Sequence, residues 1–219
     1  MFQARQFTTA ILGLVFMLAV PFVMAQTVES EEAVKQREGG GDPLAGNEKS
    51  FLCQGCHGTD GISFEPEIPK LAGQYGKYIV KQVHDYQSGA RSHPIMNAMA
   101  GTVSEPDLAD IGAYFASQRK MKGNGSAGSP IGEDIFLHGD ASKNRLACMG
   151  CHGINGKGAG PKSSMYPVLG GQQRGYIRGQ LINFREGIRT NSPTGIMNTM
   201  AKLLTDAEID ALADYISAQ

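Results

Sequence analysis

Residues 51–61 read FLCQGCHGTDG, and residues 146–158 repeat the pattern as LACMGCHGINGKG. All four cysteines of the chain lie in these stretches, as Cys53-Gln54-Gly55-Cys56-His57 and Cys148-Met149-Gly150-Cys151-His152. A Cys-Xaa-Xaa-Cys pair followed directly by His is typical of covalent haem c attachment. The two thiols can reach the two vinyl groups of one porphyrin, and the histidine then stands beneath the iron. The pattern predicts two covalently bound haem c groups, with His57 and His152 as iron ligands.

Other uses of paired cysteines are weaker alternatives. A structural zinc site could employ four thiolates, but it would have to join two distant parts of the chain and would leave the repeated histidine without a role. A redox dithiol or a structural disulfide suits an oxidising compartment. Neither of them calls for a histidine after the second cysteine in both stretches.

The similarity between the two stretches continues along the chain. LAGQYGKYIVKQVHDYQSGARS (71–92) matches LGGQQRGYIRGQLINFREGIRT (169–190), and IMNAMAGTVSEPDLADIGAYFASQ (95–118) matches IMNTMAKLLTDAEIDALADYISAQ (196–219). Counted from Cys53 and Cys148, the offset between matched residues rises from 95 to 98 and then to 101. Three matching blocks in the same order indicate one duplicated unit with two small insertions in the second copy.

Differences in amino-acid composition separate the remaining segments of the chain from the two copies of the repeat. An N-terminal basic residue, an apolar stretch and small residues before a cleavage point are typical of an export signal, and an acidic, glycine-ended segment with little apolar content is typical of a flexible tether. A Gly- and Ser-rich segment ending in Pro130 separates the copies, as expected of a linker. The resulting organisation is a signal peptide (1–25), a flexible acidic tether (26–42), an N-terminal domain (43–121), a linker (122–130) and a C-terminal domain (131–219).

Helical spacing dominates both copies and predicts an all-α fold. Thr205 and Glu208 form a capping box, after which apolar residues recur on one face. The counterpart helix of the first copy starts at Ser104, with Pro106 tolerated in its first turn. Gly132 and Phe136 suit a close crossing of the first and last helices of the second copy, whereas Gly46 is followed four residues later by Ser50, so Phe51 is expected to take over this packing.

Each iron needs a sixth ligand or an open position, and the methionines are the symmetric candidates. Met96 pairs with Met197, and Met99 pairs with Met200. The remaining histidines, His84, His93 and His138, have no histidine counterpart in the other copy. We read these three as ordinary solvated or hydrogen-bonded residues.

The combined pattern resembles class I cytochromes c, and the duplication resembles the dihaem cytochrome c4 family in particular. The resemblance rests on both Cys-Xaa-Xaa-Cys-His motifs, a proline nine residues after each histidine, the LAGQ and LGGQ blocks, and a methionine eight residues before the cap of the final helix. It implies two tandem class I cytochrome c domains. It also implies that Met96 and Met197 are the axial ligands, with Met99 and Met200 packing near the haem edge.

Two further roles follow from the resemblance. The carbonyls of Pro66 and Pro161 are expected to accept Nδ1–H of the ligand histidines and so to orient the rings. Several repeated polar residues are candidates for contacts with the haem propionates; they are Gln74, Tyr78 and Arg91 in the first copy and Gln172, Tyr176 and Arg189 in the second.

His/Met ligation closes the iron to substrates and raises its reduction potential relative to bis-His ligation, which favours an electron carrier over an enzyme. The resemblance implies a periplasmic carrier from a quinol-oxidising cytochrome bc complex, or a similar donor, toward a terminal oxidase. An alternative is the electron-accepting subunit of a periplasmic dehydrogenase; a dihaem peroxidase would need an open ligand position. With 20 basic and 21 acidic side chains, the chain has no charge excess for nucleic-acid binding, and membrane association is expected only through partners or an uncleaved N-terminal segment.

Overall fold

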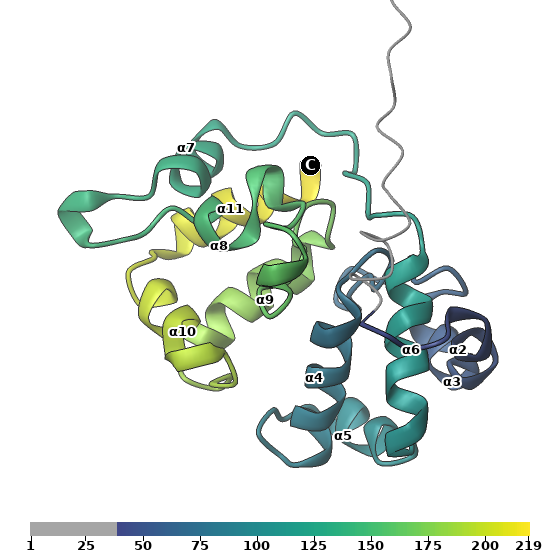
Figure 1. Ribbon diagram of the computed structural model, residues 1–219. Coiled ribbons are helices and arrows are strands. Elements are labelled where there is room, and N and C mark those ends of the chain that lie inside the picture. The colour runs from purple at the N-terminus through teal and green to yellow at the C-terminus, as the bar shows by residue number, and fades with distance from the viewer. Residues whose placement is uncertain (1–38) are drawn as a thin grey trace, which may run out of the picture.

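The computed structural model describes residues 39–219. The expected signal peptide, 1–25, and the expected tether as far as residue 38 lie outside the described residues. Two groups of helices lie side by side, and each contains one of the Cys-Xaa-Xaa-Cys-His motifs (Figure 1). Below, the N-terminal half is residues 39–121 and the C-terminal half is residues 131–219.

Both halves use the same succession of helices. The N-terminal half contains α2 (Pro43–Lys49), α3 (Phe51–His57), α4 (Gly76–Gln87), α5 (Pro94–Ala100) and α6 (Glu105–Ser117). The C-terminal half contains α7 (Pro130–His138), whose first residue is the last of the expected linker, α8 (Met149–His152), α9 (Arg174–Arg185), α10 (Ile196–Ala201) and α11 (Asp206–Ala218). It also contains the short 3-10 turns η1 (Ala141–Lys143), η2 (Ile154–Gly156), η3 (Pro161–Ser163) and η4 (Pro193–Gly195).

No β-strand forms within residues 39–219, where the only pairing of that kind is an isolated antiparallel bridge between Asp140 and Arg145. The all-α prediction is therefore confirmed. Among the same residues, none of the helices has the length and apolar character needed to cross a bilayer.

Local sequence explains where the helices begin. Asp42 caps α2 by accepting the backbone N–H of Leu44, and Ser129 caps α7 by accepting that of Gly132. A proline follows each of these caps, in the first turn, where a missing N–H costs no helical hydrogen bond. The expected capping box of the final helix is present, because Thr205 and Glu208 each bond the other's backbone N–H. Ser104 stands at the corresponding start of α6, but its hydroxyl bonds the Asp107 carboxylate instead of a backbone N–H.

The first and last helices of each half cross at a glycine. A Cβ atom on Gly46 would lie 2.0 Å from the Asp110 carbonyl oxygen, and one on Gly132 would lie 2.0 Å from the Ala211 carbonyl oxygen. Both distances are far below van der Waals contact, so only glycine permits these approaches. Near these crossings, Cys53 of the first attachment motif packs against the core of the N-terminal half, and Cys148 and Met149 of the second pack against the core of the C-terminal half.

The expectation for Phe51 is wrong. Its side chain is 75% exposed, whereas Ser50 is fully buried at the α2–α6 crossing, as Phe136 is at the α7–α11 crossing. The hydroxyl of Ser50 donates to the Asn47 carbonyl oxygen and accepts a hydrogen bond from Gln54. A small, hydrogen-bonded residue therefore fills a position that an aromatic ring fills in the other half.

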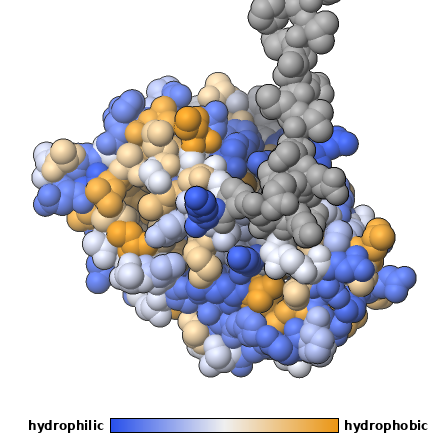
Figure 2. All heavy atoms as spheres, viewed as in Figure 1, coloured by the Kyte–Doolittle hydropathy of each residue, from blue (hydrophilic) through white to orange (hydrophobic). Residues whose placement is uncertain are grey.

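Apolar surface remains exposed around the attachment segment of the C-terminal half. Figure 2 shows hydrophobic side chains gathered over α7 and α8. Ile131, Leu146 and Ile154 are each more than 60% exposed. Leu146 and Ile154 flank Cys148 and His152 in the sequence, so the apolar surface borders the expected haem position.

Candidate haem sites

The two motif histidines occupy equivalent buried positions. His57 ends α3 and is 6% exposed, and His152 ends α8 and is 5% exposed. His57 Nδ1 lies 2.8 Å from the Pro69 carbonyl oxygen, and His152 Nδ1 lies 2.9 Å from that of Pro167. Because a carbonyl only accepts, Nδ1 carries the proton and Nε2 keeps its lone pair.

Burial also holds both rings neutral. It lowers the pKa of His57 and of His152 below the usual value, against the opposing effect of the carbonyl hydrogen bond. A neutral imidazole with a fixed ring and an available Nε2 is the form that ligates a metal. The structure thus supplies in each half the histidine that the motif predicts.

The expectation for the prolines is wrong, because Pro69 and Pro167 make the contacts assigned to Pro66 and Pro161. The Pro66 carbonyl instead accepts the backbone N–H of Tyr176, 3.0 Å away in the other half. Pro161 begins the 3-10 turn η3. The sequence contained a signal that could have identified them, since Pro69 and Pro167 each stand two residues before the LAGQ and LGGQ blocks and share their offset of 98.

The cysteines are arranged as two separate pairs of free thiols. Burial raises the pKa of the Cys53 thiol, and it raises that of Cys148 to about 11. Thiols held protonated in this way are poor metal ligands and poor redox nucleophiles. Among residues 39–219, moreover, no three His, Cys, Asp or Glu side chains meet in a way that could hold a metal ion. The raised pKa values argue against a role for Cys53 and Cys148 in the zinc and redox-dithiol alternatives.

The candidate methionines lie on equivalent short helices. Met96 and Met99 belong to α5, which packs on α4, and Met197 and Met200 belong to α10, which packs on α9. All four side chains are partly buried. The backbone N–H of Met96 donates to His93 Nδ1 (3.3 Å), and that of Met197 donates to the Ser192 hydroxyl (3.2 Å). The start of each helix is thus held by a different side chain.

Two of the propionate candidates, Gln74 and Gln172, join the two halves in a reciprocal way. The Gln74 side chain accepts the Val168 N–H and donates to the Val168 carbonyl, with both distances 2.9 Å. The Gln172 side chain forms the same pair of bonds with Lys70, at 2.7 and 2.9 Å. Each glutamine therefore completes the backbone hydrogen bonds of the opposite half.

The arginine and tyrosine candidates form a second reciprocal network. Arg91 donates to the Tyr176 hydroxyl (3.0 Å) and to Gln180 (2.9 Å) across the junction between α4 and α9. Arg189 donates to the Tyr78 hydroxyl and to Gln82, both at 3.0 Å. Each arginine also bonds the glutamine of its own half at 2.7 Å. Gln82 and Gln180 were not among the propionate candidates, although they are identical residues at the same offset of 98.

These arginines fit a cofactor that carries carboxylates. Arg91 and Arg189 are each only 7% exposed, yet no Asp or Glu of the described residues lies within ion-pair distance of either one. A buried charge is costly unless a counter-charge is near. Two buried guanidinium groups, two neutral buried histidines and two pairs of free thiols together match the chemistry of two haem c groups.

Comparison with known proteins gives concordant matches. A family model described as Cytochrome c matches residues 138–219. The cytochrome c4 of Pseudomonas aeruginosa is 42% identical over 178 residues, which cover 80% of this chain and 88% of that protein. A thiosulfate dehydrogenase electron acceptor from Stutzerimonas stutzeri is 32% identical and covers 89% of this chain and 88% of its own length. The crystal structure of reduced cytochrome c4 from Pseudomonas stutzeri superposes with a TM-score of 0.76 at 40% identity, covering 81% of this chain and 98% of that one.

Proposed function

This chain belongs to the cytochrome c4 family, and we propose that it carries electrons in the periplasm from a quinol-oxidising cytochrome bc complex, or a similar donor, toward a terminal oxidase. Two haem c groups are bound covalently, and the protein transfers electrons rather than catalysing a substrate reaction. When bound, haem c supplies reversible one-electron chemistry. The observation that carries the proposal is the equivalence of the two halves, each with a buried neutral histidine next to its attachment thiols.

The proposed attachment residues are Cys53 and Cys56 for one haem and Cys148 and Cys151 for the other. The residues proposed to hold the irons are His57 with Met96 and His152 with Met197. What supports the histidines is their Nδ1–H donation, which leaves Nε2 for the iron. Met96 and Met197 are supported by their matched positions near the start of α5 and α10. If these side chains held the irons, they would exclude water and substrates from them.

We also propose that the halves are separate domains, 43–121 and 131–219, joined by the linker 122–130. Each half has its own buried cluster, one including Ile79, Ile111 and Phe115 and the other including Phe136, Ile209 and Leu212. The two share the smaller cluster of Tyr75, Met121 and Val168. Export and the acidic tether remain part of the proposal.

Reconstitution with membranes tests the carrier function. The purified dihaem protein should be reduced by quinol in the presence of membranes that hold a cytochrome bc complex, and reoxidised by membranes that hold a terminal oxidase. A bc-complex inhibitor should block only the reduction. Reduction that proceeds at the same rate without these membranes, or with the inhibitor, contradicts the proposed donor.

The dehydrogenase-subunit alternative has one specific observation in its favour, namely the similarity to the thiosulfate dehydrogenase electron acceptor. In that case the natural donor is a periplasmic dehydrogenase. Isolation of the native protein discriminates the two roles, because an obligate subunit copurifies in fixed proportion with its enzyme and a mobile carrier does not.

A further inference from the structure

A basic groove lies at the junction of the two halves, beside the end of α6. Its cavity volume is about 730 Å³, and its walls include Asp60, Ile62, Lys70, Arg119, Lys120 and Lys122. Four of these six side chains are cationic and one is anionic. Arg119, Lys120 and Lys122 are exposed, whereas Lys70 is half-buried.

The positive charge of the groove is not compensated within the described residues. None of its four cations lies within 4 Å of a carboxylate there, in contrast to Lys49, Lys81 and Arg145, which all form ion pairs. Lys157, from the C-terminal half, adds a further cation. Its ammonium group donates to backbone oxygens of Met121, Gly170 and Gln219. Burial lowers the pKa of Lys157 below its ordinary value, and the neighbouring charges of Lys120 and Lys70 lower it further.

Only a few covalent and hydrogen bonds separate the groove from the proposed iron ligand of the N-terminal half. His57 donates to the Pro69 carbonyl at 2.8 Å, and the next residue is the groove residue Lys70. In the C-terminal half the same succession runs from His152 through Pro167 to Val168. Val168 is 1% exposed and is covered by Gln74 and Tyr75. In the N-terminal half, the hydrogen bond of the histidine therefore leads to a residue of the groove. In the C-terminal half, the equivalent hydrogen bond leads to a residue buried between the two halves.

We propose that this groove is the docking site for an acidic surface segment of a redox protein partner, which exchanges electrons with the N-terminal haem. The inference rests on the proposed carrier function and adds the docking surface to it. If the partner is the donor, one electron would pass from its reduced centre to the oxidised haem that His57 would hold, and no atom is transferred. A partner that is an acceptor takes the same electron in the opposite direction.

The shape and charge of the groove favour a protein segment over a small oxyanion. The groove is open, it is larger than a phosphate ion, and three of its cations are flexible exposed side chains. It lies at the C-terminal end of α6, where the helix dipole disfavours a small anion held by backbone groups. Exposed cations spread over a surface instead attract an oppositely charged protein toward that surface and raise the rate of transient association.

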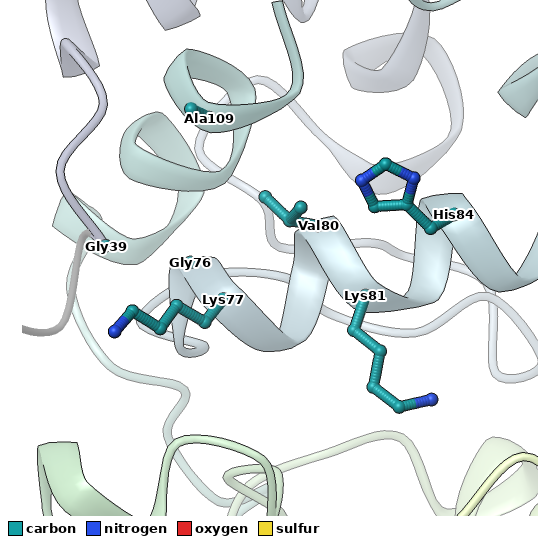
Figure 3. A pocket seen from close by; sticks show the side chains of 7 residues that line it. All are labelled: Gly39, Gly76, Lys77, Val80, Lys81, His84 and Ala109. Carbon is teal, nitrogen blue, oxygen red and sulfur yellow. The ribbon is translucent and has the colours of Figure 1, made fainter. Parts of the chain in front are cut away.

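The test compares two double variants of the full dihaem chain. Lys120→Gln/Lys122→Gln neutralises the groove. Lys77→Gln/Lys202→Gln removes the same charge from exposed positions elsewhere, Lys77 lining a separate hollow of about 440 Å³ beside α4 (Figure 3). The probe is a fluorescent polyglutamate peptide, whose dissociation constant is measured at low ionic strength and again near 0.15 M salt, where surface charge is screened within about 8 Å.

The expected result is that the groove variant binds polyglutamate about threefold to tenfold more weakly than the parent, while the control variant binds as the parent does. Equal weakening in both variants, or none in either, overturns the proposal. Circular dichroism and the haem absorption spectrum verify that each variant is folded. Reduction by quinol in the presence of membranes that hold a cytochrome bc complex is measured in parallel: its failure in the parent contradicts the proposed donor, whereas the peptide measurement still decides the groove.

Discussion

At the crossing of its first and last helices, the C-terminal half buries the ring of Phe136 where the N-terminal half buries the hydroxyl of Ser50. The glycine that allows each crossing is present in both halves, and each approaches a backbone carbonyl of the last helix equally closely. The backbone geometry of the repeat is therefore maintained by one residue, while the residue one turn later determines how much apolar surface the crossing buries. The glycine is therefore the same in both copies of the repeat, whereas the residue one turn later differs.

A second difference lies next to the final helix. In the C-terminal half, the buried Arg145 donates to Glu208 at 2.9 Å, and these side chains are 5% and 16% exposed. The N-terminal counterpart of Glu208 is Asp107, which pairs with Lys49 at 3.0 Å among side chains more than 30% exposed. The same position in the repeat thus holds a protected ion pair in one half and a solvent-screened pair in the other, which differ in strength.

The largest expected effect tests whether the halves ligate iron equivalently. Met96→Ala and Met197→Ala should each remove half of the weak far-red absorption of the oxidised protein, because that band reports the thioether–iron bond of one haem. Absorption spectra of the two variants and of their double variant measure this. Full intensity in both single variants would point instead to Met99 and Met200, the other methionines of α5 and α10.

Removing the ring at the helix crossing should distinguish the two cores. Phe136→Ala leaves a cavity at a fully buried site and is expected to cost about 3 to 5 kcal/mol of unfolding free energy. Ser50→Ala loses only hydrogen bonds at the matched site, at a cost of about 1 kcal/mol. Urea titrations followed by circular dichroism compare the variants. Equal losses would show that the crossing of the N-terminal half depends on Ser50 as strongly as the other depends on its ring.

The reciprocal glutamines offer a sharper comparison, because their geometry is the same and their surroundings differ. Gln74→Leu leaves the N–H and carbonyl of buried Val168 without these partners and is expected to destabilise the protein by about 2 to 3 kcal/mol. Gln172→Leu should cost less, since the half-buried Lys70 backbone can bond water instead. The measurement is again the urea midpoint, and a larger effect for Gln172→Leu would contradict this reasoning.

The smallest expected effect depends on pH. Burial opposes ionisation of Glu208, but hydrogen bonds from the Thr205 backbone and from Arg145 and Lys143 prevail and lower its pKa from 4.5 to about 2. Since the folded-state pKa is the lower one, the pair stabilises the protein above about pH 4.5 and loses this contribution as the pH falls through about 2.

The matched variants for this prediction are Glu208→Gln and Asp107→Asn. At pH 7, Glu208→Gln should reduce the unfolding free energy by about 1 to 2 kcal/mol, and the difference from the parent should vanish near pH 2. Asp107→Asn should have a smaller effect, because its partner Lys49 is exposed to solvent. Stability measured at both pH values checks the prediction; a Glu208→Gln deficit that persists at pH 2 would exclude the ion pair as its cause.

Much of the local structure was predictable from the sequence, because it depends on residues that are close together in the chain. The repeat, the attachment segments, the glycines of the helix crossings and the Thr205–Glu208 capping box all appear as expected. The packing expected of Phe51 failed, since an aromatic residue next to a small one carries no information about which of the two faces the neighbouring helix.

What the sequence alone determined is the number of haem groups and the helices that hold them, since a Cys-Xaa-Xaa-Cys-His segment specifies its chemistry within five residues. Only the tertiary structure decided that Pro69 and Pro167, rather than Pro66 and Pro161, orient the histidines, and that Gln74, Gln172, Arg91 and Arg189 join the two halves. The physical reason is that these hydrogen bonds link residues up to about a hundred positions apart, and their partners are set by how the loops close and how the two copies pack against each other.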